Sequence, residues 1–225
     1  MIGTLVNAVA VILGSLVGLA FGKKFSEKIK KMVFQGIGLV TLFIGFNMSL
    51  KTSNIIVLFF SILIGAVVGE AIDIERYLER LGESVKAMFS LKGDRFVEGF
   101  IVAFILFCMG SMTIIGSIED GLNGDPTILY AKSMLDGFAS ISLASALGAG
   151  VLLSAIPLIA YQGGITLLAS MSKTFFTETV INELSATGGI ILIGLGINIL
   201  EIKQIKVSNL LPSLIFSAVI AYFLL

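Results

Sequence analysis

Long apolar stretches alternate along the chain with short polar connections. A helix needs about 20 apolar residues to cross the roughly 30 Å hydrocarbon core of a bilayer. The pattern predicts eight helical spans: Ile2–Gly22, Val33–Leu50, Ile55–Ile72, Phe96–Gly116, Leu135–Ala149, Val151–Ser170, Gly188–Leu200 and Asn209–Leu225. The seventh is short, and only Gly150 separates the fifth from the sixth, in the stretch Gly148-Ala149-Gly150. A re-entrant hairpin over residues 135–170 is therefore an open alternative, so we expect seven or eight spans.

Two of the polar connections are themselves amphipathic. In KKFSEKIKKMVF (residues 23–34) the apolar side chains lie on one helical face and the lysines on the other. In DIERYLERLGESVKAMFS (residues 73–90) apolar side chains recur every three or four residues, which is typical of an amphipathic helix. We expect both helices to lie in the membrane interface, with lysines toward anionic headgroups. Packing on the inner end of the protein itself is an equal alternative.

The composition has far more apolar surface than a water-soluble core could bury. Hydrophobic residues make up 56% of the 225 residues, charged residues only 13%, and the mean hydropathy is +1.05. A soluble domain carries roughly 25% charged residues. We therefore expect an all-α integral membrane protein with one transmembrane domain over residues 1–225. No segment typical of a removed signal peptide precedes the first span.

Lysine and arginine indicate the orientation, because cytoplasmic loops collect them. If all eight segments cross and the N-terminus is outside, twelve of the 15 basic residues lie inside. This predicts that the basic loops 23–33 and 73–95 are cytoplasmic and that loop 117–134 is outside. The hairpin alternative gives almost the same charge bias.

The residue inventory excludes several kinds of chemistry. The chain has no histidine and one cysteine, Cys108, inside an apolar stretch. An internal disulfide and a cysteine-rich metal site are thus excluded, and the commonest metal ligand and general base is missing. No nucleotide-binding fingerprint or nucleophile–base pair appears. We expect no enzyme activity, no cofactor, no metal site and no nucleic-acid partner.

The chain contains an internal repeat. Residues 23–51 resemble residues 173–203 at an offset of 151, which matches Phe25 with Phe176, Gly38 with Gly189, Gly45 with Gly196, and Asn47 with Asn198. We expect a first repeat over residues 1–72, central segments over 73–149, and a second repeat over 150–225. The copies start on opposite sides of the membrane in the eight-span topology. This inverted arrangement is typical of carriers, although duplication without transport is the plainer alternative.

Pairs of glycines four residues apart occur in the first and third spans. These are Gly14 with Gly18 and Gly65 with Gly69. Small residues at this spacing let helix backbones approach closely in lipid. We expect them to serve helix packing, either within one chain or across a homodimer.

Polar residues gather around the stretch MGSMTIIGSIEDGLNGD, residues 109–125. Its glycines predict a loss of helix, and irregular backbone at membrane depth must line a wet cavity or be buried in protein. Pro157 and the pair Gly163 and Gly164 predict a second break, in the sixth span. The candidate residues for binding a solute or ion are Glu119, Asp120, Asp136, Ser111, Thr113, Ser117, Ser140, Tyr161, Gln162, Asn47 and Asn198.

Each candidate has a structural alternative. Glu119 and Asp120 could cap a helix end in water, and Asp136 could be the N-cap of the next helix. A single asparagine in a span, such as Asn7, Asn47 or Asn198, more often joins helices than binds a ligand.

Several motifs resemble one known family. GTLVNAVAVILGSLVG (residues 3–18), residues 109–125, LDG at Leu135–Gly137 and YQG at Tyr161–Gly163 are similar to the bacterial membrane-protein family known as domain of unknown function 554. The similarity runs from residue 1 to about 225, and GSIEDGL is its most specific part. The resemblance implies a multi-spanning, transporter-like protein with no established substrate. It also implies location in the plasma membrane of a prokaryote.

The repeat, the predicted breaks and the clustered carboxylates together favour a secondary transporter. We expect it to move a small solute or ion by alternating access about a midplane site, coupled to a cation such as Na⁺ or H⁺. An ion channel and a non-transporting membrane scaffold are the alternatives.

Overall fold

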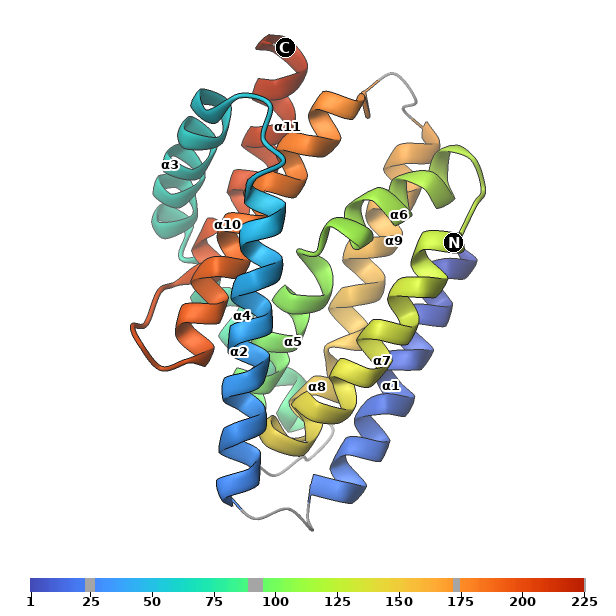
Figure 1. Cartoon of the computed structure of the whole chain (residues 1–225), viewed down its shortest axis with the longest axis vertical. Helices are drawn as coiled ribbons and strands as arrows, with labels where there is room; N and C mark the ends of the chain where they lie inside the picture. The colour runs from blue at the N-terminus through green and yellow to red at the C-terminus, as the bar shows by residue number, and fades with distance from the viewer. Residues whose placement is uncertain (23–26, 89–94, 172–174, 225) are drawn as a thin grey trace.

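The computed structural model describes residues 1–22, 27–88, 95–171 and 175–224, and these ranges are helical with no β-strand among them (Figure 1). The elements are α1 (Ile2–Gly22), α2 (Glu27–Ser49), α3 (Ile55–Ile72), α4 (Ile74–Met88), α5 (Phe96–Cys108), α6 (Ser111–Leu122), α7 (Thr127–Leu147), α8 (Gly150–Leu153), α9 (Ala155–Met171), α10 (Glu178–Ile199), the 3-10 helix η1 (Val207–Leu210) and α11 (Pro212–Leu224). Parts of the predicted amphipathic and basic loops, at Lys23, Lys24, Phe25, Phe89, Lys92 and Lys173, lie outside the described residues.

Several of these helices have the length and composition of membrane spans. Within the described residues five qualify: Ile2–Phe21, Ile55–Ile72, Gly150–Met171, Glu178–Ile199 and Val207–Leu224. A sixth results if α5 and α6 form one broken span, since their axes are bent by 57° at residues 109–110. In α2 the apolar part is the shorter segment Phe34–Ser49. The predicted all-helical membrane character is thus confirmed.

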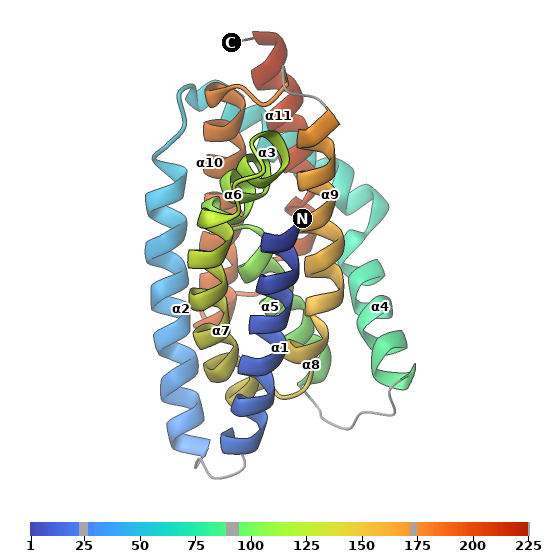
Figure 2. The ribbon, with the colours of Figure 1, turned by 90° about the vertical axis from the view of Figure 1, so that its right-hand side faces the viewer.

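The helices form a bundle in which distant parts of the sequence lie side by side (Figure 1, Figure 2). α1 runs along α7, α2 along α10 and α3 along α11, while α6 packs on α9. α5 lies among these pairs, and its phenylalanines Phe96, Phe100, Phe104 and Phe107 are buried. The interior is mainly apolar, so any charged group inside it needs a physical explanation.

Most helix boundaries follow the apolar pattern, but three helices begin earlier than predicted. α1 and α3 match their predicted ranges. α2 starts at Glu27, α7 at Thr127 and α10 at Glu178, each at least six residues before the predicted span. The early start of α10 is stabilised by its N-cap, because the side chain of Thr177 accepts a 3.3 Å hydrogen bond from the backbone nitrogen of Val180.

The predicted loss of helix over residues 109–125 is wrong for residues 111–122, and helix is absent only at the two ends of this stretch, at residues 109–110 and 123–125. The chain breaks at Met109 and Gly110 and then forms α6, which continues through Gly116 and Gly121. These glycines serve close packing instead: a Cβ at Gly121 would collide with the backbone carbonyl of Thr166 on α9. Small residues have this role where helices meet in a membrane.

The predicted break at the middle of the sixth span is also wrong. α9 continues through Gly163 and Gly164. The interruption falls earlier, at Ser154 between α8 and α9, and Pro157 follows in the first turn of α9. Proline is tolerated there because the first N–H groups of a helix have no partner within it. The chain reverses just before α8 at Gly148, whose φ of 86° favours glycine.

Both predicted glycine pairs pack within the chain. Gly14 and Gly18 allow α1 to approach the backbone carbonyls of Gly137 and Ile141 on α7. Gly65 and Gly69 similarly face Ser213 and Asn209 at the start of α11 and in η1. The glycine faces of α1 and α3 are therefore occupied inside one chain.

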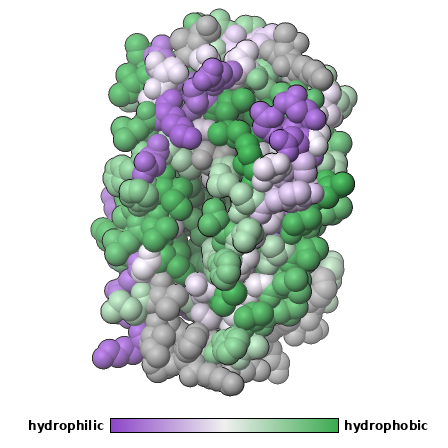
Figure 3. Space-filling view, turned by 45° about the vertical axis from the view of Figure 1, so that its right-hand side comes forward, coloured by the Kyte–Doolittle hydropathy of each residue, from purple (hydrophilic) through white to green (hydrophobic). Residues whose placement is uncertain are grey.

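The outer surface is largely apolar. Figure 3 shows hydrophobic side chains over most of one face, with hydrophilic ones gathered toward the upper end and the lower left. Large exposed hydrophobic residues are common on α1, α2 and α3, including Leu13, Phe43 and Phe59. The predicted helix over residues 73–90 is present as α4, and it exposes Tyr77, Leu81 and Met88. Such a surface suits a lipid environment.

Candidate functional site

A buried polar cluster joins α1, α7 and α9 inside the bundle. It consists of Asn7, Lys132, Asp136 and Gln162. The Nδ2 atom of Asn7 donates to Oδ2 of Asp136 at 3.0 Å and to Oε1 of Gln162 at 3.0 Å. The ammonium group of Lys132 donates to the same Oδ2 of Asp136. All four residues are at least 92% buried. The cluster is thus a buried ion pair whose carboxylate also accepts from Asn7, and Asn7 in turn donates to Gln162.

Local structure explains how these side chains meet. Lys132 and Asp136 are four residues apart on α7, and this spacing places their side chains on one helical face. Gly14 on α1 faces the carbonyl of Gly137, which brings the two helices close enough for Asn7 to reach Asp136. The aromatic ring of Phe107 lies 6.0 Å from Nζ of Lys132, at the outer limit of a cation–π contact.

Several buried polar atoms in and near the cluster have no hydrogen-bond partner among the described residues. They include Oδ1 of Asn7, Nε2 of Gln162 and Oγ1 of Thr4. An unsatisfied buried polar group costs about 1–3 kcal/mol, and most such groups in proteins are satisfied by protein or water. Free donors and acceptors beside an ion pair give this region the capacity to bind a polar solute or water.

A cavity of about 570 Å³ opens beside the ion pair, between α2, α5, α7 and α10. Lys132 and Asp136 form part of its wall, together with Thr41 and Ser142. The remaining wall is mainly apolar, formed by Ile37, Val40, Ile44, Leu106, Phe107, Leu135, Ala139 and Leu192 among others. Its volume lies within the roughly 300–1,000 Å³ of small-molecule sites, which are likewise mostly apolar with few polar groups.

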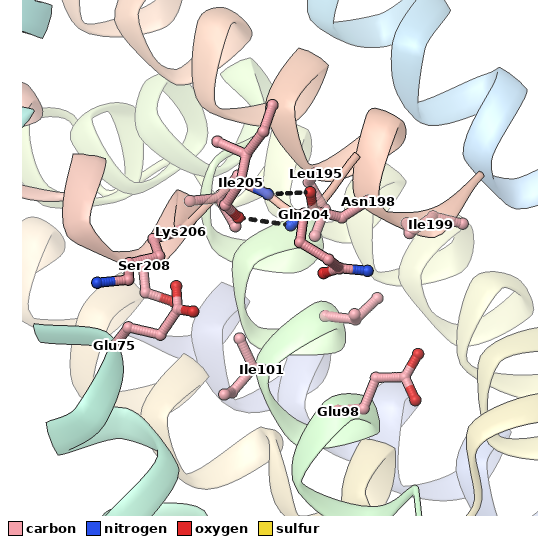
Figure 4. A pocket seen from close by; sticks show the side chains of 12 residues that line it. Glu75, Glu98, Ile101, Leu195, Asn198, Ile199, Gln204, Ile205, Lys206 and Ser208 are labelled. Carbon is pink, nitrogen blue, oxygen red and sulfur yellow. Dashed lines mark hydrogen bonds between the residues drawn. The ribbon is translucent and has the colours of Figure 1, made fainter. Parts of the chain in front are cut away.

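A second cavity, of about 380 Å³, lies among α4, α5, α10 and the segment that leads into η1 (Figure 4). Figure 4 shows Glu75 on α4 and Glu98 on α5 beside it. Asn198 holds the opposite wall, because its amide donates to the carbonyl of Ile205 at 2.7 Å and accepts from the nitrogen of Ile205 at 2.8 Å. Burial, with the nearby charge of Glu79, raises the pKa of the Glu75 carboxyl.

A further buried carboxylate lies outside the described lining of both cavities. Glu183 on α10 is fully buried and accepts hydrogen bonds from the connection between α2 and α3. The donors are Oγ1 of Thr52 at 2.8 Å and the backbone nitrogens of Ser53 at 2.6 Å and Asn54 at 3.0 Å. Glu183 therefore fixes this connection rather than facing a cavity.

The structure brings together only part of the predicted site. Asp136 and Gln162 meet through Asn7. Asp120 is also buried, but it pairs with the N-terminal amine of Met1 at 2.7 Å. Ser117 is buried without a partner for its hydroxyl among the described residues.

The other predicted residues have structural contacts. The hydroxyls of Thr113 and Ser140 donate to the carbonyls of Phe107 and Asp136, at 2.6 and 2.7 Å. Thr113 thereby links the two sides of the α5–α6 bend. The ring of Tyr161 packs edge-on against Phe104.

Glu119 and Asn47 lie away from the cluster. Glu119 accepts a 2.6 Å hydrogen bond from the side-chain amide of Asn123 at the end of α6. Asn47 is exposed and donates to the carbonyl of Phe43 in its own helix. Asn198 lines the second cavity instead, and the side chain of Ser111 lies outside the described residues.

Sequence reasoning missed the cation of the site. It assigned Lys132 to an outer loop, whereas α7 begins eight residues earlier than predicted and carries Lys132 inside. The available signal was the spacing of four residues between Lys132 and Asp136. Within the described residues no three His, Cys, Asp or Glu side chains lie together as a metal site would require.

Comparisons with known proteins agree with the membrane character. Residues 2–222 match the family described as "Protein of unknown function (DUF554)". The chain is similar to "Uncharacterized membrane protein YdfK" of Bacillus subtilis (strain 168), with 35% identity over 99% of this chain and 96% of the relative. It is also similar to "Uncharacterized protein YqgA" of Escherichia coli (strain K12), with 30% identity over 96% of this chain and 94% of the relative. No solved structure matches the chain.

Proposed function

The chain belongs to the DUF554 family, and from its buried polar cluster we propose that it is a secondary transporter of a small solute, coupled to a cation. The observation that carries the proposal is the ion pair of Lys132 and Asp136, hydrogen-bonded to Asn7 inside an apolar bundle. Charged groups within membrane helices are costly and mark pathways for solutes, ions or protons. Unused donors and acceptors on Asn7 and Gln162 surround the pair.

Helix packing supports the proposed inverted repeat. Gly45 on α2 lies against Gly189 on α10, and Gly196 on α10 lies against Leu42 and the carbonyl of Gly38 on α2. At the offset of 151, Gly38 corresponds to Gly189 and Gly45 to Gly196. Gly45 therefore contacts the counterpart of Gly38, and Gly38 contacts the counterpart of Gly45. Such reciprocal contacts are those expected across a two-fold axis between antiparallel copies.

The other helix pairs agree with this arrangement. α3 contacts α11 and α1 contacts α9, and each pair consists of equivalent segments in the two proposed repeats. In Figure 1, α1 runs toward the lower end while α9 runs toward the upper end. Inverted repeats of this kind give carriers two related gates about a central site. In the proposed topology the chain crosses eight times, with the N-terminus and the short connection between α6 and α7 outside the plasma membrane.

The neighbour of Asp136 favours a proton over Na⁺ as the coupling cation. A sodium site needs several oxygen ligands close together, but the ammonium of Lys132 already lies against Oδ2 of Asp136. A proton needs no such space, because it can be carried by the carboxylate itself. Buried carboxylates commonly serve as proton relays in transporters.

Flux measurements in proteoliposomes test this proposal. Vesicles loaded with the pH dye pyranine would receive a panel of amino acids, organic acids, amines and sugars, one at a time. We expect at least one solute to cause saturable proton movement, and Lys132→Gln with Asp136→Asn in one chain to abolish it. A steady proton or ion current without added solute would instead identify a channel. Absence of any flux in folded protein would contradict a transport function.

A further inference from the structure

We propose that the 570 Å³ cavity binds an organic acid with an apolar body, whose carboxylate pairs with Lys132 while Asp136 takes up one proton. The inference rests on the proposed transport function for its purpose and names the class of solute transported. Its binding step can nevertheless be measured without transport. The acid reaches the site as the anion, and its apolar part occupies the cavity wall between α2 and α7.

Lys132 has hydrogen-bonding capacity left for the carboxylate of a ligand. An ammonium group has three donors, and among the described residues only Oδ2 of Asp136 accepts from it. The carboxylate of Asp136 accepts its two described hydrogen bonds, from Lys132 and Asn7, on that same oxygen. Its Oδ1 has no described partner. The pair therefore presents spare donors and one spare acceptor, which is the complement of a carboxylic acid group.

Charge balance carries the second step. The pair is neutral overall and buried, and an uncompensated charge at this depth is expensive. A bound carboxylate would leave one net negative charge in the cavity. Protonation of Asp136 removes this charge, since the carboxylate then pairs with Lys132 and the new O–H of Asp136 can donate to the ligand. Anion and proton thus bind together in a ratio of one to one.

No other titratable group is as well placed to take this proton. α1 has no titratable side chain, and α9 has only Tyr161. On α5 the thiol of Cys108 interacts electrostatically with both Lys132 and Asp136, but a thiol has no proton vacancy at neutral pH. On α6, Asp120 is paired with the N-terminal amine. The described titratable side chains of α2 and α10, at Lys28, Lys31, Glu178 and Glu183, are not among the lining of this cavity.

The apolar wall of the cavity favours an anion with an apolar body over a small polar ion as the ligand. Ile37, Val40 and Ile44 lie at intervals of three and four residues on α2, and they face Leu106 and Leu192 across the cavity. A fully hydrated ion gains nothing from such a wall. An apolar group gains about 25 cal/mol for each Å² removed from water.

Benzoate is a suitable probe because it joins one carboxylate to a compact apolar ring. Binding to the full chain in lipid nanodiscs would be measured by isothermal titration calorimetry, with empty nanodiscs as the blank. Buffers of different ionisation enthalpy report the protons taken up. We expect saturable binding with about one proton per benzoate, and at least tenfold weaker binding of benzylammonium.

Matched variants separate the two roles. Lys132→Gln should weaken benzoate binding at least tenfold. Asp136→Asn should retain binding but take up no proton, since Lys132 is then the only charge. Thr41→Val, which alters the same cavity without changing its charge, should keep the proton uptake of the unaltered chain. The double variant of Lys132→Gln with Asp136→Asn restores neutrality, so its loss of binding reports the charge rather than misfolding.

Three results would overturn the inference: preferred binding of benzylammonium, unchanged benzoate binding in folded Lys132→Gln, or no proton uptake in the unaltered chain. Benzoate binding without flux in proteoliposomes would retain the inference and contradict the transporter. Flux of other solutes without benzoate binding would contradict the inference and retain the transporter.

Discussion

The buried carboxylate of Glu183 accepts a 2.6 Å hydrogen bond from the backbone nitrogen of Ser53, although 130 residues separate them in sequence. Thr52 and Asn54 donate to the same carboxylate. One side chain of α10 therefore satisfies three donors in the connection between α2 and α3. This connection ends at Asn54, the N-cap of α3, whose side chain accepts from the backbone nitrogen of Ile56.

Glu183→Ala should destabilise the protein strongly. It leaves the backbone N–H of Ser53 and the hydroxyl of Thr52 without their acceptor, whereas the N–H of Asn54 keeps a 3.2 Å hydrogen bond to Oγ1 of Thr52. Since these donors are only partly buried, we expect a total loss of about 1–3 kcal/mol. Thermal unfolding in nanodiscs would measure the loss, and hydrogen exchange should show faster exchange at Ser53 and Asn54. Glu83→Ala on exposed α4 is the control. Equal stability of both variants would mean that the contacts of Glu183 contribute little.

The ion pair of Lys132 and Asp136 should show strong coupling in a double-mutant cycle. Removing one partner of a buried pair costs roughly 3–5 kcal/mol because it strands a charge. We expect Lys132→Met or Asp136→Asn alone to be more destabilising than the two together. Unfolding free energies of the four proteins supply the coupling energy. Additive effects would indicate that water or lipid headgroups already screen the pair.

Gly45→Ala should test the contact between α2 and α10. A Cβ at this position would lie 2.8 Å from the carbonyl oxygen of Gly189, so we expect a loss of about 1–3 kcal/mol from overpacking. Gly36→Ala on the same helix is the matched control, since no atom lies within 4 Å of its Cβ position. There the gain in helix propensity of up to about 1 kcal/mol should dominate. Similar stabilities would contradict the close approach at Gly45.

Cysteine labelling should establish the topology. The native Cys108 is fully buried, so it should not react with polar maleimides in the folded protein. A cysteine replacing Lys28 or Arg80 should react only after the membrane is permeabilised, whereas one replacing Asn123 should react in intact cells. The opposite pattern would reverse the proposed orientation.

Glu75 should make stability fall with rising pH. Burial raises the pKa of its carboxyl above the usual 4.5, so the folded state holds this proton more tightly than the unfolded state. Its contribution to stability is therefore lost as pH rises from the unfolded pKa through the folded pKa. Glu75→Gln should raise the melting temperature at pH 7 but leave it unchanged at pH 4. An equal shift in melting temperature at pH 7 and pH 4 would mean that Glu75→Gln changes stability through packing and not through protonation.

Apolar periodicity predicts the helices well because a membrane span needs one long apolar segment. It gives the bounds of α1 and α3 as observed and the start of α5 at Phe96. Glycine is less informative, since the same residue can end a helix or let two helices touch. Gly148 ends one, whereas Gly121 lies inside α6 and makes a close contact. Gly121 is recognised as a packing residue only once its close contact with α9 is seen.

The candidate site was predictable in part for a similar reason. Asp136 and Gln162 attract attention as polar residues in apolar segments, and the structure joins them through Asn7. Lys132 is not predicted as a site residue, because the topology count based on basic residues assigns each lysine to a loop. Asn47 and Asn198 are equivalent in the proposed repeat, yet one is exposed and the other holds a loop. Sequence equivalence does not fix which side of a helix meets the interior.

The reciprocal glycine contact between α2 and α10 constrains how this protein can evolve. Gly45 is in contact with Gly189, the counterpart of Gly38, rather than with its own counterpart Gly196. A larger residue in one half must therefore be compensated at a non-equivalent position in the other half. Under the proposed repeat, the two halves can drift in charge, but the sizes of the residues at these contacts must change together. Covariation should link residue 45 with 189 and residue 38 with 196.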